Sequence, residues 1–262
     1  MTEKLQIAKA FVNYFLSAKY PKKEDIPFLS TLYHEVIASK KNYYIFDEIE
    51  ALRGVLLRNH QKITVKDLGA GSRVDKSKIR KISSITKNTV NDAKTGQMLF
   101  RLVNFLQPKH VVELGTSLGI NTLYLAKAAK NSSVYTLEGC PNTLSLAREN
   151  FKQLNSKNIT AIEGNIDTEL KTLLEKLPQI DLVFFDANHR KKPTIDYFKA
   201  CLPLAKQKSV FIFDDIYWSL EMKEAWQEIV LHPQVTLSID FFELGIIFFR
   251  NDLPKKQLIL RF

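Results

Sequence analysis

The spacing of apolar residues along the chain changes near residue 110. Before this point, apolar side chains recur at steps of three and four, from Leu5 to Phe15, from Phe28 to Val36 and from Ile45 to Leu56. Such spacing places apolar residues on one face of a helix, so these stretches are predicted to be helices. We therefore expect residues 1–91 to form an N-terminal helical cap that covers the substrate, and residues 92–262 to form the main domain.

The end of this first region has a different texture. Residues 72–95 are polar and basic with few apolar anchors, and they lead into a stretch with Met98, Leu99, Leu102 and Phe105 at helical spacing. This pattern predicts a mobile segment or a loop followed by a helix.

From residue 110 onward, short β-branched runs alternate with amphipathic stretches. This alternation is typical of a parallel sheet with crossover helices. The candidate strands are HVVEL at 110, SVYTLE at 133, ITAIEG at 159, DLVFFDA at 181 and SVFIFDD at 209.

Two more apolar runs, QVTLSIDFF and LGIIFFRN, follow near the end of the chain. The link between them around Glu243 is too short for a parallel crossover, so the two strands are predicted to be antiparallel neighbours. The predicted fold class is α/β: a Rossmann-like, doubly wound, seven-stranded sheet with a C-terminal antiparallel hairpin, preceded by the helical cap.

Composition adds the class of protein. The 262 residues are 45% hydrophobic, which is enough for a sizeable core, and no apolar run approaches the roughly 20 residues of a membrane helix. Cys140 and Cys201 show no metal-ligand spacing, so reduced thiols are expected and a disulfide framework is not. We expect a soluble, cytoplasmic protein without a membrane partner.

The chain is basic, with a formal net charge of +10 and a pI near 9.4. Such a charge suits an RNA partner or an anionic substrate. However, the lysines are scattered apart from short clusters at 189–192 and 76–81, and there is no long basic tail. A solvated lysine-rich surface is the simpler interpretation.

The first strand of the second region ends in the motif VVELGTSLGINTLYL, residues 111–125. In an open parallel sheet, ligands bind beyond the carboxyl ends of the strands, where the strand order reverses. Gly115 allows a sharp turn off the strand, and Gly119 is expected to let a ligand approach the start of the helix. Glu113 at the strand end would repel a pyrophosphate, so it favours a ligand with positive charge.

The next two strands add polar residues at the same edge. Glu138 ends the second strand about 23 residues after Gly115, where an acid accepts hydrogen bonds from both hydroxyls of a ribose. Asn165 follows the third strand, where its amide could border an adenine ring. An adenosyl group with a cationic tail describes S-adenosylmethionine.

The motifs ELGTSLG, LEG, EGN, DLVFFDANH and FIFDD, in this order, resemble those of class I S-adenosylmethionine-dependent methyltransferases. The similarity is greatest to the catechol-type and sugar O-methyltransferase branch, and it covers about residues 92–250. It implies that Glu113 handles the amino end of the methionine moiety, directly or through water. It also implies that Glu138 holds the ribose, that Asn165 lies by the adenine, and that the loop around the methionine moiety consists of Gly115, Ser117, Gly119 and Asn121.

A second glycine-containing stretch, ITVKDLGAGSR at 63–73, competes for the role of cofactor loop. No helical apolar face follows it, and no acid-ended strand comes after it at the right distance. We predict a cap element near the active site, with Ser72 and Arg73 as candidate substrate contacts. A plain surface turn is an equal alternative.

The fourth and fifth strands carry the candidate chemistry. Asp186 ends the fourth strand, and His189 three residues later has a side chain suited to a general base at neutral pH. Asp214 and Asp215 end the fifth strand, so three carboxylates converge on one edge in a set that suits Mg²⁺. We therefore predict His189 and Asp186 as catalytic, and Asp186, Asp214 and Asp215 as metal ligands; Asp186 is also a candidate cofactor contact.

Each of these assignments has a simpler alternative. Asp186 could merely contact the cofactor or the backbone, Asp215 could cap the helix that begins near Ser219, and His189 could be a surface residue. Lysine is frequent at the position of His189 in the catechol-type enzymes, and histidine occurs in the sugar-modifying members, so catechol-like substrates are in doubt.

The leading hypothesis is O-methylation of a small-molecule hydroxyl by S-adenosylmethionine, with Mg²⁺ as an optional helper. An RNA methyltransferase is the alternative suggested by charge, but DANH stands where base-directed enzymes carry an Asn/Asp-Pro-Pro-aromatic segment. A non-catalytic protein that binds a nucleotide cofactor is a further alternative. A homodimer is compatible with the sequence, which does not reveal the acceptor.

Overall fold

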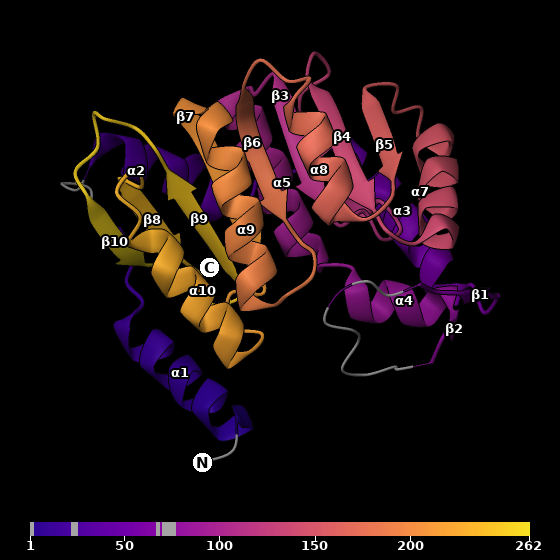
Figure 1. Cartoon of the computed structure of the whole chain (residues 1–262), viewed down its shortest axis with the longest axis horizontal. Helices are drawn as coiled ribbons and strands as arrows, with labels where there is room; N and C mark the ends of the chain where they lie inside the picture. The colour runs from indigo at the N-terminus through magenta and orange to yellow at the C-terminus, as the bar shows by residue number, and fades with distance from the viewer. Residues whose placement is uncertain (1–2, 22–25, 67–68, 70–76) are drawn as a thin grey trace.

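The computed structural model describes residues 3–21, 26–66, 69 and 77–262. Its centre is an eight-stranded sheet with the order β10-β8-β9-β7-β6-β3-β4-β5, and helices cover both faces (Figure 1). The five predicted parallel strands are all present. They are β3 (His110–Leu114), β4 (Ser133–Glu138), β5 (Ile159–Glu163), β6 (Ile180–Phe185) and β7 (Ala205–Asp214).

The predicted antiparallel pair is also confirmed. Strand β9 (Leu244–Phe248) lies between β7 and β8 (Leu237–Asp240) and runs antiparallel to both. The sheet has one strand more than the seven predicted, because β10 (Lys256–Ile259) pairs in parallel with β8. The outer side of β10 is not bare, since Lys19 forms a parallel bridge with Leu260.

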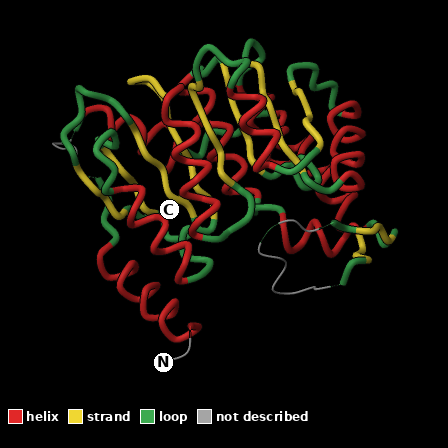
Figure 2. The backbone as a smooth tube through the Cα atoms, in the orientation of Figure 1, coloured by secondary structure: helices red, strands yellow, loops and turns green. Residues whose placement is uncertain are grey.

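Helices lie on both faces of the sheet (Figure 2), and a separate apolar cluster fills the space between the sheet and each layer of helices. One face packs against α8 (Ile166–Leu174), α9 (Lys191–Cys201) and α10 (Leu220–Val230), through residues such as Leu170, Phe198 and Trp226. The other face packs against α5 (Ala93–Leu106), α6 (Ile120–Ala128) and α7 (Pro141–Gln153). Because helices cover both faces, the central strands are apolar on both sides.

Polar residues fix several helix starts that face the ligand edge of the sheet. Asp92, Asn165 and Ser219 cap α5, α8 and α10, each through a side-chain oxygen that accepts from a backbone N–H. The interpretation of Asp215 as the cap of the last helix is therefore wrong. Ser219 accepts from the backbone N–H of Met222 at 3.1 Å instead.

The chain begins with α1 (Glu3–Ser17), α2 (Pro27–Leu32), the π-helical turn η1 (Tyr33–Ile37) and α3 (Tyr44–Arg58). The last three of these belong to the same core as the sheet. Leu32, Val36 and Ile49 are fully buried and share one apolar cluster with α5 and α6. Helix α1 extends from the body of the molecule in Figure 1 and carries exposed apolar residues such as Leu16, which is 77% exposed.

A smaller unit follows α3 and leads back to the sheet. Strands β1 (Lys62–Thr64) and β2 (Ile79–Lys81) form an antiparallel hairpin, and α4 (Ile82–Thr89) continues from it. The predicted loop followed by a helix is confirmed for the described part of this segment. Ser72 and Arg73 lie outside the described residues.

The topology fixes where a ligand is expected. Strand β3 has β4 on one side and β6 on the other. The chain runs outward from β3 through β4 to β5 and then crosses back to β6, so the strand order reverses between β3 and β6. This reversal opens a crevice at the carboxyl ends of β3 and β6. Within the described ranges, no helix has the length and apolar character needed to cross a membrane.

Candidate active site

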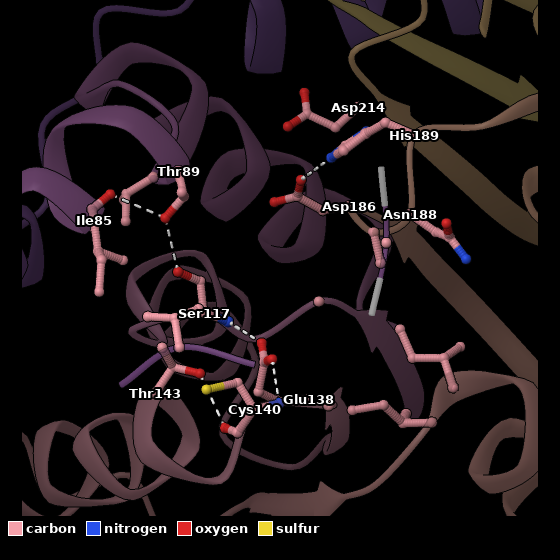
Figure 3. Close-up of a pocket in the computed structure, with 18 of the residues that line it drawn as sticks. Ile85, Thr89, Ser117, Glu138, Cys140, Thr143, Asp186, Asn188, His189 and Asp214 are labelled. Atoms are coloured by element: carbon pink, nitrogen blue, oxygen red, sulfur yellow. Dashed lines mark hydrogen bonds and ion pairs between the residues drawn. The ribbon is translucent and has the colours of Figure 1, made fainter. Parts of the chain in front are cut away.

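A cavity of about 380 Å³ lies at the carboxyl ends of the central strands (Figure 3). It contains most of the residues that the sequence singled out. Those that line it are Gly115, Ser117, Glu138, Asn165, Asp186, His189, Asp214 and Asp215. Three predicted cofactor residues, Glu113, Gly119 and Asn121, do not line it and lie behind those that do.

Gly115 makes the turn that joins β3 to this cavity. Its φ of 99° is a left-handed conformation that favours glycine, as the sequence predicted. A Cβ at this position would lie 2.0 Å from the carbonyl oxygen of Asp186. The glycine therefore allows the end of β3 to approach the end of β6, and it brings the two sides of the site together.

Gly119 makes room for helix packing. Its φ of 78° is also left-handed. A Cβ there would lie 2.4 Å from the Phe151 ring of α7, so the space beside this glycine is filled by protein. That Gly119 also lets a ligand approach the helix stays a prediction.

Glu113 is completely buried at the end of β3. One carboxyl oxygen accepts hydrogen bonds from the hydroxyls of Thr122 and Thr136, and the Thr136 bond is 2.6 Å. The other oxygen, Oε1, has no hydrogen-bond partner. Burial raises the pKa of Glu113 to about 7, although the two threonine hydroxyls oppose this rise.

Asn121 extends from the first turn of α6 toward the fourth strand. Its Nδ2 donates to Asp186 Oδ2 at 3.3 Å. Its buried Oδ1 has no hydrogen-bond partner, like the free oxygen of Glu113. Two acceptor atoms without donors therefore lie behind the β3 loop, an arrangement that suits a ligand group or water carrying N–H or O–H donors.

Glu138 ends β4 and is held by two backbone amides. Ser117 N–H donates to its Oε2 and Cys140 N–H donates to its Oε1, both at 2.8 Å. These bonds fix the orientation of the carboxylate at the wall of the cavity. The position thus fits the predicted contact with a diol.

Asn165, just after β5, lines the cavity. Its side-chain oxygen accepts from the backbone N–H of Asp167 at 3.1 Å and so caps α8. It lines the same cavity as Glu138. Glu138 and Asn165 reach the same edge of the sheet because they lie at the ends of β4 and β5, which are neighbouring parallel strands.

Asp186 follows β6 and Asp214 ends the neighbouring strand β7, and both line the cavity; Asp214 is buried, and the side chain of Asp186 is 13% exposed. Burial and the nearby charge of Asp215 raise the pKa of both groups. This side of the cavity therefore holds acids that favour a proton or another positive charge.

His189 lies between the acids of the two strands. Its Nε2 is 3.8 Å from Asp186 Oδ1, and its Nδ1 is 3.8 Å from Asp215 Oδ2. The backbone around it is unusual, with φ of 67° at Asn188, 26° at His189 and 55° at Asp215. Non-glycine residues in this region are costly and concentrate at functional sites.

Three aspartates at this edge of the sheet were predicted to bind Mg²⁺. Asp186, Asp214 and Asp215 reach one edge of the sheet, as expected. In the part of the chain that the structure describes, however, no group of three histidine, cysteine or acidic side chains is arranged to hold a metal ion. The imidazole of His189 lies between Asp186 and Asp215 instead. The metal site stays a prediction.

The structure adds residues that sequence reasoning missed. Thr89, at the end of α4, shares a 2.9 Å hydrogen bond with the Ser117 hydroxyl of the cofactor loop. Lys66 N–H donates to the Cys140 sulfur at 3.3 Å. Both contacts join the segment before α5 to the sheet, and no local motif in the sequence announces them.

The stretch at 63–73 lies near the site in its described part. Val65, Lys66 and Gly69 line the cavity, and a Cβ on Gly69 would lie 3.0 Å from the Cα of Asn188. The prediction of a cap element near the site is thus supported. Among the described residues before α5, those that line the cavity all lie between 65 and 91, so the first three helices do not cover it.

The aromatic pair after β7 divides between two roles. Trp218 lines the cavity, with its ring centroid 6.1 Å from that of His189. Tyr217 points elsewhere: its hydroxyl donates to Asp240 at 2.9 Å and its ring stacks on Phe242. Both cysteines are free and buried, as expected.

Part of the chain is similar in sequence to known methyltransferases. Residues 112–216 match the family model described as a methyltransferase domain. A catechol O-methyltransferase of Niastella koreensis is 29% identical over 124 residues, which are 46% of this chain and 55% of that protein. A catechol O-methyltransferase of Mycobacterium tuberculosis is 28% identical over 130 residues, which are 47% of this chain and 56% of that protein. The matched region thus spans about half the length of these relatives.

Solved structures share the fold over a larger part of the chain. A SAH-bound methyltransferase of Podospora anserina has a TM-score of 0.62 and 17% identity, and the match covers 90% of this chain and all of that one. An O-methyltransferase of Bacillus cereus in complex with SAH has a TM-score of 0.55 and 17% identity, with 80% and 92% covered. The Rossmann-like methyltransferase fold and the resemblance to the class I family are confirmed.

Proposed function

We propose that this chain is an S-adenosylmethionine-dependent O-methyltransferase that acts on a hydroxyl group of a small molecule. The observation that carries the proposal is the shared cavity of Glu138 and His189. Glu138 is oriented to accept from the two hydroxyls of a ribose, and His189 is placed to accept a proton. The curated relatives are catechol O-methyltransferases, which supports a hydroxyl as the acceptor group.

The fit of the cofactor depends on acceptors rather than on a phosphate cradle. When bound, S-adenosylmethionine supplies a methyl group on a cationic sulfur. Glu138 would take the ribose hydroxyls, and Asn165 would border the adenine. The unpartnered oxygens of Glu113 and Asn121 suit water molecules that bind the amino end of the methionine moiety.

The residues at β6 and β7 would handle the proton of the acceptor. The acceptor oxygen forms a bond to the methyl carbon, the carbon–sulfur bond breaks, and its electron pair stays on the sulfur. The acceptor proton passes to a ring nitrogen of His189. The imidazolium then lies 3.8 Å from carboxylate oxygens of both Asp186 and Asp215, which stabilise its charge.

Two variants test the proposal separately. Glu138→Gln places an amide N–H against a backbone N–H donor of Ser117 or Cys140, so we expect S-adenosylmethionine affinity to fall by about tenfold or more. His189→Ala should slow turnover by about 10²-fold or more while leaving that affinity nearly unchanged. Calorimetric titration and release of S-adenosylhomocysteine measure the two effects.

The control is Glu163→Gln, at the half-exposed end of β5. This change removes one carboxylate outside the cavity, so affinity and turnover should both stay as in the parent protein. Binding of NAD in place of S-adenosylmethionine would contradict the proposal. Full turnover in the His189→Ala variant would contradict the role of this histidine as the base.

A further inference from the structure

A second cavity, of about 470 Å³, lies beside α5 and shares no lining residue with the first. Three residues of α5 face it at helical spacing: Lys94, Gln97 and Arg101. Asn91, just before this helix, lines the first cavity. At 1.5 Å per residue, Asn91 and Arg101 are about 15 Å apart along the helix, so the two cavities are neighbours but distinct.

The second cavity is strongly basic. Lys40, Lys94, Arg101 and Arg261 line it, and its described lining residues include neither aspartate nor glutamate. Its volume is within the range of small-molecule sites, about 300–1,000 Å³. Four positive charges around one small space repel one another unless an anion or solvent screens them.

Arg101 is the central observation, because it is only 8% exposed. Its Nε and Nη2 donate to the carbonyl oxygen of Lys41 at 3.2 and 3.0 Å, and Nη2 also reaches Gln97 Oε1 at 3.5 Å. All of these acceptors are neutral. Buried guanidinium groups normally pair with a carboxylate or phosphate, and Arg101 forms no ion pair with any residue that the structure describes.

Two of the other cations, Lys94 and Arg261, contact aromatic rings, and neither forms an ion pair with a residue that the structure describes. Lys94 Nζ lies 4.0 Å from the centroid of the Phe262 ring, and Arg261 lies 5.6 Å from that of Tyr20. Cation–π contacts position a charge without neutralising it.

The walls of the cavity offer a surface for a planar group. Tyr20, Tyr33 and Phe262 line it together with the four cations. The centroids of the Tyr20 and Tyr33 rings are 6.2 Å apart, and the two rings form a T-shaped pair. Aromatic walls and clustered cations together match a ligand with a flat apolar part and an anionic end.

We propose that this second cavity binds a small phosphorylated ligand that carries a planar ring. The guanidinium of Arg101 and the ammonium of Lys94 bind the phosphate, and Arg261 adds charge from the C-terminal side. The aromatic residues pack against the ring. The site does not depend on the proposed methyl transfer, because the two cavities share no residue.

Calorimetric titration with phenyl phosphate tests this site. The protein is kept in excess S-adenosylhomocysteine, so that the first cavity is filled, and benzyl alcohol serves as the uncharged probe. We expect saturable binding of phenyl phosphate and none of benzyl alcohol. Lys94→Gln and Arg261→Gln should each weaken binding by about five- to tenfold.

Two further variants separate a built site from general attraction to a basic protein. Lys130→Gln removes the same charge from an exposed loop and should leave binding unchanged. Arg101→Lys keeps the charge but loses the planar fork, so binding should weaken even if the variant folds normally. If Arg101→Lys does not fold, the Lys94 variant still tests the site.

Four results would overturn the proposal. They are the absence of saturable binding at millimolar phenyl phosphate, equal binding of benzyl alcohol, equal losses in Lys94→Gln and Lys130→Gln, and competition with S-adenosylhomocysteine. The last result would place the phosphate in the first cavity. Failure of these tests would leave the response of Glu138→Gln to S-adenosylmethionine unaffected, so the two proposals fail separately.

Discussion

The two sides of the first cavity use carboxylates in opposite ways. On the β4 side, Glu138 receives two backbone N–H groups at 2.8 Å, so its orientation is fixed by donors. On the β6 and β7 side, burial and the neighbouring charge of Asp215 raise the pKa of Asp186 and of Asp214. Under the proposed function, the first arrangement would hold the cofactor in place, and the second would take up positive charge. A binding half and a reactive half thus meet within one crevice.

The largest effect is expected where the two halves touch. Gly115→Ala would place a Cβ 2.0 Å from the Asp186 carbonyl oxygen, on a residue with φ of 99°. We expect a loss of at least about 3 kcal/mol in the free energy of unfolding, or no folded protein. Chemical denaturation measures this change.

The matched control is Gly54→Ala in the middle of α3. A Cβ there would meet only the Arg58 side chain, at 3.5 Å. Because alanine favours helix, this variant should gain about 0.5–1 kcal/mol. Similar stability of the two variants would show that the halves are not joined through Gly115.

The next effect concerns the pH dependence of stability at Glu113. Burial raises its pKa from an ordinary 4.5 to about 7 in the folded protein. The folded state then holds the proton more tightly than the unfolded state, so stability should fall as pH rises from about 4.5 to about 7 and level off above it. The whole contribution is on the order of 3 kcal/mol.

Glu113→Gln removes this titration, so the free energy of unfolding should depend less on pH across the same range. Denaturation at several pH values measures the slope. Glu163→Gln, half exposed at the end of β5, should keep the slope of the parent protein. An unchanged slope in Glu113→Gln would show that Glu113 is not the buried acid that controls it.

The free energy of unfolding should rise when the repulsion between the carboxylates after β6 and β7 is reduced. Asp214→Asn removes a buried carboxyl whose pKa is raised by burial and by the charge of Asp215, so we expect about 1 kcal/mol more stability at pH 8 and slower turnover. Asp47→Asn, exposed on α3, is the control and should change neither quantity. A loss of stability in Asp214→Asn would contradict the repulsion between the acids.

The smallest effect is expected at the contact between α4 and the binding half. Thr89→Val removes the 2.9 Å hydrogen bond to the Ser117 hydroxyl, so cofactor affinity should fall by less than tenfold, with a stability loss of about 0.5–1 kcal/mol. Thr172→Val on α8 is the control, because that hydroxyl bonds only within its own helix. Equal responses would show that α4 does not influence the cofactor loop.

The sheet was largely predictable because its central strands are continuous apolar runs that end in acids. Parallel strands end at one edge, so Glu138, Asp186 and Asp214 could be placed together from the sequence. Strand β10 could not be predicted in the same way. Its four residues, KQLI, have no distinctive alternation, and the strand exists because the edge of β8 accepts it.

Side-chain roles within the site were less accessible than its location. Gly119 matched a ligand-binding pattern, yet the ring that fills its space belongs to Phe151, more than 30 residues away. The Thr89 contact likewise joins segments that are adjacent only in the fold. Local spacing predicts which edge a residue reaches, whereas packing between distant segments decides what it touches there.

The bridge between Lys19 and Leu260 has a mechanical consequence. Lys19 N–H donates to the Ile259 carbonyl at 3.0 Å, and Arg261 N–H donates to the Lys19 carbonyl at 3.2 Å. Tension applied to α1 would therefore be transmitted into the last strand, and unzipping would start at that border and proceed toward β8. Detaching residues 18–20 would leave backbone N–H and C=O groups on the outer edge of the last strand unpaired. Such an exposed edge can pair with a strand of another molecule.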